Sequence, residues 1–156
     1  MRQHPITPLH EVARRGLGAL SRAYLSKDGR TLYAAERYPG RVPHLVSIDL
    51  ASGKVTELTE LRGSLPYKVT SLAYDSNGQT LFYTTNNAGL RNLLAYDLKS
   101  GRSRTLLEAA RIGDLAYNSA DGSLWGLRTN NGFVMVVRLP QPYTEWQTLF
   151  VYPYGE

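Results

Sequence analysis

The stretch Val69–Leu107, VTSLAYDSNGQTLFYTTNNAGLRNLLAYDLKSGRSRTLL, decides the fold because it has the pattern of four short strands separated by turns. Asn77-Gly78 supplies the positive φ angles of a tight hairpin, and Gly89 and Gly101 mark the next two turns. The predicted strands are Val69–Tyr74, Thr80–Thr85, Arg91–Leu98 and Ser103–Leu107. Strands joined in order by short turns form an antiparallel meander. Because a lone meander buries too little surface to be stable, this unit needs further sheets beside it.

The same pattern occurs twice more, in Ser21–Leu58 and in Asp114–Phe150. A period of about 45 residues indicates a fold built from stacked copies of one supersecondary unit. Equivalent positions hold the glycines Gly29, Gly78 and Gly122, the leucines Leu32, Leu81 and Leu124, and the tyrosines Tyr24, Tyr74 and Tyr117. The third strands end in Asp49-Leu50 and Asp97-Leu98, and Arg138-Leu139 takes that position in the last copy. The sequence therefore predicts an all-β fold with three consecutive four-stranded antiparallel units, 21–58, 69–107 and 114–150.

One additional strand is expected near the N-terminus. Thr7 precedes Thr56 by the repeat period, so Pro5–Val12 is predicted to be the last strand of a preceding unit. The alternative is a short helix, because Leu9–Arg15 has some helical propensity. Glu60–Lys68 and Glu108–Gly113 are spacers between copies. We therefore expect residues 1–156 to form a single repeat domain.

The composition excludes several classes of protein. With 42% hydrophobic and 20% charged residues, the chain is not a disordered polymer. It has no cysteine, which excludes disulfides and zinc–thiolate sites but leaves the redox compartment open. No apolar run approaches the roughly 20 residues of a membrane helix, so we expect no membrane insertion. The net charge of +5 is concentrated in residues 1–41, where the basic residues fall mostly at turns and strand edges with no aromatic stacking platform between them, so we expect a solvated surface and no nucleic-acid partner.

The repeat resembles the TolB-type, WD-like β-propeller repeat, in which each meander is one blade. The residues that carry the resemblance are Tyr74, Asn77, Gly78, Leu81, Tyr96, Asp97, Leu98, Gly101 and Leu107. A true WD repeat has Trp-Asp where this chain has Ile48-Asp49 and Tyr96-Asp97. The resemblance implies either an interaction platform in the bacterial envelope, and so a periplasmic location, or the non-catalytic propeller part of a prolyl-oligopeptidase-like hydrolase.

The sequence contains no recognisable catalytic set, so we expect no enzyme activity, no cofactor and no metal. His10-Glu11 begins like a zinc-protease helix, but Arg14 stands where the second histidine is required. Asp75–Gly78 and Asn118–Gly122 carry oxygen ligands that suit calcium, although turn formation also explains both. Asp49 and Asp97 are predicted to cap the turns that follow them.

The candidate binding surface consists of the loops between second and third strands, in which arginine, tyrosine and asparagine offer adaptable hydrogen bonding. Its residues are Arg37, Tyr38, His44, Asn86, Asn87, Arg91, Asn92, Asn130 and Asn131. The alternative is that these residues only form turns. The leading functional hypothesis is a non-catalytic protein-interaction platform, a fragment of a longer protein. The alternatives are the substrate-gating propeller of a hydrolase whose catalytic domain lies elsewhere, and a small-ligand or sugar-binding propeller.

Packing between the units follows from the same pattern. Tyr33, Phe82 and Trp125 occupy equivalent positions and are expected to lie between blades. Three blades leave an apolar face uncovered at each end, and such faces drive association. The sequence therefore predicts either a homo-oligomer, with two copies forming a six-bladed ring, or a segment of a longer parent chain.

Overall fold

The computed structural model describes residues 17–61, 71–75, 77–87 and 90–153, which form twelve strands and no helix. The predicted strand Pro5–Val12 and its helical alternative lie outside the described residues. The first four strands are β1 (Ala19–Leu25), β2 (Thr31–Arg37), β3 (His44–Asp49) and β4 (Val55–Glu60). The next four are β5 (Ser71–Asp75), β6 (Thr80–Asn87), β7 (Leu90–Asp97) and β8 (Arg102–Leu107). The last four are β9 (Ile112–Asn118), β10 (Ser123–Asn130), β11 (Phe133–Leu139) and β12 (Gln147–Pro153).

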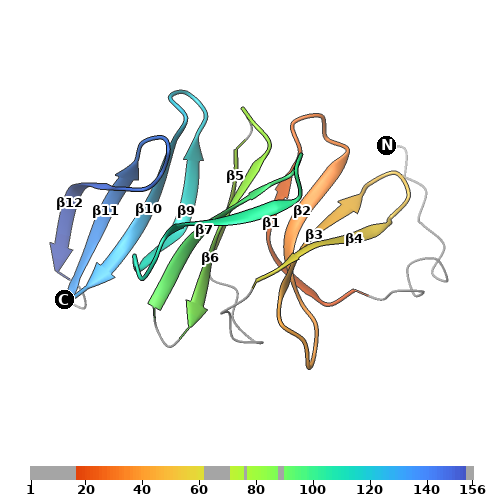
Figure 1. The fold of residues 1–156 in the computed structure, drawn as a ribbon, viewed down its shortest axis with the longest axis horizontal. Coiled ribbons are helices and arrows are strands. Elements are labelled where there is room, and N and C mark those ends of the chain that lie inside the picture. Colours follow the sequence, from red (N-terminus) through yellow and green to blue (C-terminus); the bar gives the residue numbers. More distant parts are fainter. Residues whose placement is uncertain (1–16, 62–70, 76, 88–89, 154–156) are drawn as a thin grey trace, which may run out of the picture.

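These strands form three four-stranded antiparallel sheets, each a meander of consecutive strands. The second sheet lies between the first and the third (Figure 1). First strands of successive sheets contact each other, β1 with β5 and β5 with β9. The all-β prediction of three consecutive propeller blades is confirmed. No helix long and apolar enough to cross a bilayer occurs in the ranges given above.

Strand pairing corrects three positions in the repeat alignment, one of which is Gly122, equivalent by register to Gln79 and not to Gly78. Tyr74 pairs with Leu81 and Tyr117 with Leu124, but the residue that pairs with Leu32 is Leu25, not Tyr24. Since successive side chains alternate between faces, Tyr24 points to the face opposite to that of Leu25. The spacing in the sequence accounts for this difference, because Tyr24 lies one residue further from Leu32 than Tyr74 lies from Leu81.

The third correction concerns the end of β11. Leu139 lies opposite Leu124, as Tyr96 lies opposite Leu81. The residue equivalent to Asp97 is therefore Pro140, and the prediction that Arg138-Leu139 takes the Asp-Leu position is wrong. Because Pro140 does not resemble aspartate and does not continue the strand, the residue pattern places the end of β11 too early.

The turn role predicted for Asp49 and Asp97 is confirmed. The Oδ1 atom of Asp97 accepts hydrogen bonds from the backbone N–H groups of Lys99 and Ser100, at 2.8 and 3.3 Å. These bonds hold the pKa of the Asp97 carboxyl below its usual value. Asp49 accepts in the same way from Ala51 at 2.9 Å. Each turn closes on a glycine with positive φ, Gly53 and Gly101.

Two apolar cores lie between successive sheets. The first joins Ala35 and Leu45 of the first sheet to Leu72, Leu81 and Tyr83 of the second. The second joins residues of β6 and β7 to β9, β10 and β11, with Phe82, Leu93, Leu115, Leu124 and Val137 among its members. Fully burying one such side chain contributes about 1.5–3 kcal/mol, so each sheet depends on its neighbour.

The outer face of the third sheet is apolar and exposed. Leu127 and Val136 pair with each other, and Val136 also pairs with Phe150, so the three side chains share this face. Phe150 is 57% exposed. Tyr33 and Phe82 pack between sheets as predicted. The equivalent residue Trp125 shares the outer face with Leu127, and within the described residues no further sheet packs on it, so its place between blades stays a prediction.

The first sheet does not present an equivalent open face. Ala34 and Val46 pair with each other on the side that points away from the second sheet, yet both are fully buried. The prediction of an uncovered apolar face therefore holds for the third sheet and is wrong for the first.

Candidate functional site

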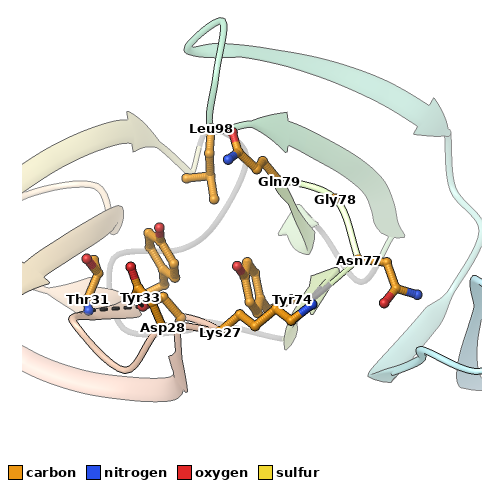
Figure 2. Close-up of a pocket in the computed structure, with 10 residues that line it drawn as sticks. Lys27, Asp28, Thr31, Tyr33, Tyr74, Asn77, Gly78, Gln79 and Leu98 are labelled. Carbon is orange, nitrogen blue, oxygen red and sulfur yellow. Dashed lines mark hydrogen bonds between the residues drawn. The ribbon is translucent and has the colours of Figure 1, made fainter.

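A cavity of about 540 Å³ lies between the first and second sheets, at the edge where the strand pairs β1–β2 and β5–β6 turn. We call it the interblade pocket, and we call this edge of the sheets the turn edge. Figure 2 shows Tyr33 and Tyr74 side by side, with Leu98 facing them. The residues that line the pocket are Ser26, Lys27, Asp28, Thr31, Tyr33, Tyr74, Asn77, Gly78, Gln79 and Leu98.

Two tyrosines form the aromatic wall of the pocket. Tyr33 comes from β2 of the first sheet and Tyr74 from β5 of the second, and their ring centroids lie 5.5 Å apart at 36°. Both side chains are half-buried. Burial raises the pKa of the Tyr33 hydroxyl, and the nearby Tyr74 and Asp28 add to this. Tyr33 therefore stays a neutral phenol at physiological pH, with a ring face for stacking and a hydroxyl for hydrogen bonding.

The polar side of the pocket is held in place by its own turn. Asp28 Oδ1 accepts from Ser26 Oγ at 2.6 Å and from the Arg30 N–H at 3.0 Å. These two bonds lower the pKa of the Asp28 carboxyl. Ser26 Oγ in turn accepts from the Thr31 N–H at 3.0 Å. A turn that is already ordered loses little conformational entropy when it binds a ligand.

The second turn of the pocket is fixed across the next sheet boundary. Asp75 Oδ1 accepts from the N–H groups of Asn77 and Gly78. The Asn77 side chain donates through Nδ2 to the Ser119 carbonyl of the third sheet at 2.7 Å. The oxygen-rich stretch Asp75–Gly78 thus forms a turn. Within the part of the chain that the structure describes, no cluster of three histidine or carboxylate side chains could hold a metal.

At the boundary between the second and third sheets, an aromatic side chain fills the space that corresponds to the interblade pocket. There Phe82 is equivalent to Tyr33, and Tyr117 to Tyr74. A third ring, Tyr143, lies edge-on to Phe82, with centroids 4.7 Å apart at 71°. The Tyr143 hydroxyl donates to the Gly122 carbonyl at 2.6 Å, and the residue is only 5% exposed.

The length of one connection explains the difference between the two boundaries. Tyr143 belongs to the loop between β11 and β12, whereas β7 and β8 are joined by a tight turn over Leu98–Gly101. The tight turn extends only the Leu98 side chain toward the tyrosine pair (Figure 2). The interblade pocket at the first boundary therefore corresponds to the space that the Tyr143 ring fills at the second boundary.

The residues predicted as a binding surface lie at the opposite edge of the sheets. They belong to the connections β2–β3, β6–β7 and β10–β11, at the lower edge in Figure 1, which we call the loop edge. From the first sheet come Arg37, Tyr38 and His44, from the second Asn86, Asn87, Arg91 and Asn92, and from the third Asn130 and Asn131. The fold thus brings them to one edge, but none of them lines the interblade pocket.

Several loop-edge side chains support the backbone. Asn92 Oδ1 accepts from the Ala109 N–H at 2.8 Å, and Asn130 Oδ1 accepts from Arg111 Nη1 at 3.1 Å. Both bonds brace the connection between β8 and β9. Asn131 has a φ of 49° and precedes Gly132 at 80°, the conformation of a tight hairpin turn. The alternative interpretation as turn formers therefore describes Asn131.

His44 is also engaged locally. It is 8% exposed, and its Nε2 atom lies 3.3 Å from Arg41 Nη2. Arg41 makes a two-pronged ion pair with Glu57 at 3.0 and 3.2 Å. This cluster ties the β2–β3 connection to β4.

Sequence reasoning missed the interblade pocket. Its side chains come from two repeats and carry no motif. The only available signal was the contrast between the short turn after Asp97 and the long proline-bearing loop after Leu139.

Comparisons with known proteins support the fold. No protein-family model matches the sequence, and no curated protein matches it. TolB from Acinetobacter baumannii is similar with a TM-score of 0.68 at 13% identity, over 85% of this chain and 32% of that chain. A chain of a nidogen/laminin complex has a TM-score of 0.67 at 13% identity, over 86% and 49%. The β-propeller domain of the Trilobed protease from Pyrococcus furiosus has 0.62 at 16%, over 88% and 44%.

At these identities the similarity shows the fold alone. The chain has a β-propeller fold, and it spans between about a third and a half of the length of these structures.

Proposed function

We propose that this β-propeller segment is a non-catalytic module that binds a protein partner at its turn edge, through the interblade pocket. The observation that carries the proposal is the pocket itself, with a wall of two tyrosines beside turns that are already hydrogen-bonded. Tyrosine offers a large contact area for little loss of conformational entropy, which is why it is frequent at protein interfaces.

The loop edge is a second candidate surface of the same module. It carries the residues that sequence analysis favours, but Asn92 and Asn130 already hold the backbone or Arg111. We therefore rank it below the turn edge.

A second candidate function is the propeller part of a hydrolase. It is favoured by the similarity to a propeller domain of a protease, of which this chain spans 44%. A Gly-x-Ser-x-Gly sequence encoded in the same reading frame would support this alternative.

For the exposed face of the third sheet, defined by Trp125, Leu127, Val136 and Phe150, we propose that a second copy of the chain covers it. A self-complementary apolar patch can pack on itself across a two-fold axis, and exposed patches of this kind drive association.

The test of the partner-binding proposal compares capture by paired variants. Leu98→Trp places a larger side chain into the interblade pocket. Leu50→Trp is the matched control, because Leu50 follows Asp49 as Leu98 follows Asp97, yet it does not line this pocket. We expect a protein captured by the wild type and by Leu50→Trp, identified by mass spectrometry, to be lost with Leu98→Trp. Equal capture by all three forms would contradict the proposal.

A further inference from the structure

We propose that the interblade pocket receives the phenol ring of a tyrosine in a partner polypeptide, in the position that Tyr143 occupies at the next sheet boundary. This inference rests on the proposed partner-binding function and specifies the group that is recognised.

The register of the sheets establishes that the two positions are equivalent. Leu32 pairs with Leu25, Leu81 with Tyr74 and Leu124 with Tyr117. The residues that follow these leucines include Tyr33 and Phe82, which both point toward the next sheet and stack on its first strand. The space beside Tyr33 and Tyr74 therefore corresponds to the space beside Phe82 and Tyr117.

The second boundary shows which group this space accepts. Tyr143 contacts Phe82 edge-to-face, a favoured geometry for aromatic pairs. With Tyr143 in place Phe82 is 1% exposed, whereas its equivalent Tyr33 remains half-buried beside the empty pocket. A ring bound against Tyr33 would bury the remaining apolar surface in the same way.

The polar lining favours tyrosine over phenylalanine. At the second boundary the ring hydroxyl donates to the Gly122 carbonyl. The equivalent carbonyl in the second sheet, that of Gln79, accepts from the Leu98 N–H at 2.8 Å. A ligand hydroxyl must therefore find other partners, and Ser26, Asn77 and Lys27 line the same pocket. Ser26 already bonds to Asp28 and Asn77 to Ser119, so a phenol hydroxyl would add a further bond to this lining that an apolar ring cannot make.

The size of the pocket favours a residue within a polypeptide over a free phenol. Its volume of about 540 Å³ falls in the range of about 300–1,000 Å³ typical of sites for ligands much larger than one ring. The turn edge also continues past the pocket along the β5–β6 and β9–β10 turns, which Asn77 and Ser119 join. Flanking backbone thus has a polar surface to lie on.

The first experiment titrates the isotope-labelled chain with three probes and follows amide NMR shifts. The probes are the capped peptide Gly-Ser-Tyr-Ser-Gly, the same peptide with phenylalanine, and 4-methylphenol. We expect shifts confined to the turns at residues 26–31 and 77–79, with the tyrosine peptide binding about threefold to tenfold more tightly than the phenylalanine peptide. We expect binding to weaken at least about tenfold in Leu98→Trp and to be unchanged in Leu50→Trp. Equal affinity of 4-methylphenol and the tyrosine peptide would overturn the assignment to a polypeptide, and no shift at these turns would overturn the site.

The second experiment does not depend on the folding of Leu98→Trp. Tyr143→Ala creates a vacancy equivalent to the interblade pocket. We expect 4-methylphenol to raise the Tm of this variant more than that of the wild type, since the ligand then has two ring sites that exist only in the folded state. No rise in either protein would show that this space does not select a phenol.

The two proposals fail separately. If Leu98→Trp abolishes partner capture while no tyrosine probe binds, the interblade pocket binds a partner through another group and the present inference is wrong. If tyrosine probes bind but capture is unchanged in Leu98→Trp, partner binding through the interblade pocket is wrong, and with it the inference that a partner supplies the ring.

Discussion

Removal of the Tyr143 ring is the sharpest test of how successive sheets are joined. Tyr143 is 5% exposed, its ring centroid lies 4.7 Å from that of Phe82, and its hydroxyl donates to the Gly122 carbonyl. Replacing a buried aromatic side chain by alanine costs about 3–5 kcal/mol. For a chain of this length, that loss lowers Tm by about 6–20 °C. Tyr143→Phe keeps the ring and loses only the hydrogen bond, so we expect a cost of about 1–2 kcal/mol.

Urea unfolding followed by tryptophan fluorescence measures these costs. Trp146 is a suitable reporter because it packs against the core between the second and third sheets. Phe133→Ala is the control, since Phe133 is 46% exposed at the start of β11, on the face opposite to that of Phe150, and its removal should change stability by no more than about 0.5 kcal/mol. If Tyr143→Ala costs no more than Phe133→Ala, the ring does not hold the boundary and the equivalence with the interblade pocket loses its basis.

Three further predictions concern other parts of the molecule. Burial, together with a hydrogen bond to Asp75, raises the pKa of Tyr117 to about 12. The stability that this shift contributes is complete below pH 10 and is lost as the pH rises toward 12. In Tyr117→Phe the free energy of unfolding should therefore depend less on pH in that window, and an unchanged pH dependence would contradict the assignment. Gly126→Ala would place a Cβ atom 2.6 Å from Ile112 Cγ2 and 2.9 Å from the Gly113 carbonyl oxygen, so we expect a loss of about 1–3 kcal/mol in urea unfolding, and an unchanged midpoint would show that β9 yields freely. Light scattering at micromolar concentration should give the mass of two chains for the wild type and of one chain for Phe150→Asp, whereas a monomeric wild type would refute the second copy as the occupant of the outer face.

The strand pattern was readable from the sequence because glycine turns separate short apolar runs. The strand predicted at Thr80–Thr85 begins where β6 begins, and the strand predicted at Ser103–Leu107 ends where β8 ends. The aspartate turns were also predictable, because an Asp carboxylate caps its own turn through local hydrogen bonds. Local chemistry determines both features.

Features set by distant residues were not readable. The interblade pocket depends on Tyr33 and Tyr74, which belong to different repeats, and on a ring that only the third repeat supplies. Its existence follows from a comparison of two loop lengths in three dimensions. The loop-edge prediction selected residues by type, and the structure shows Asn92 and Asn130 bonded to their own chain.

The two boundaries between sheets differ in how many contacts hold them together, so we expect one to open before the other. One joint is closed by Tyr143, by the bond from Asn77 to Ser119 and by a buried bond from the Leu115 N–H to Ser71 Oγ at 2.7 Å. The other contains a cavity. Proteins open first where contacts are fewest, so backbone amides of β2 should exchange with deuterium sooner than those of β10. A ligand ring bound beside Tyr33 would add contacts across the boundary between the first and second sheets. Ligand binding should then slow the exchange of backbone amides with deuterium throughout the first blade.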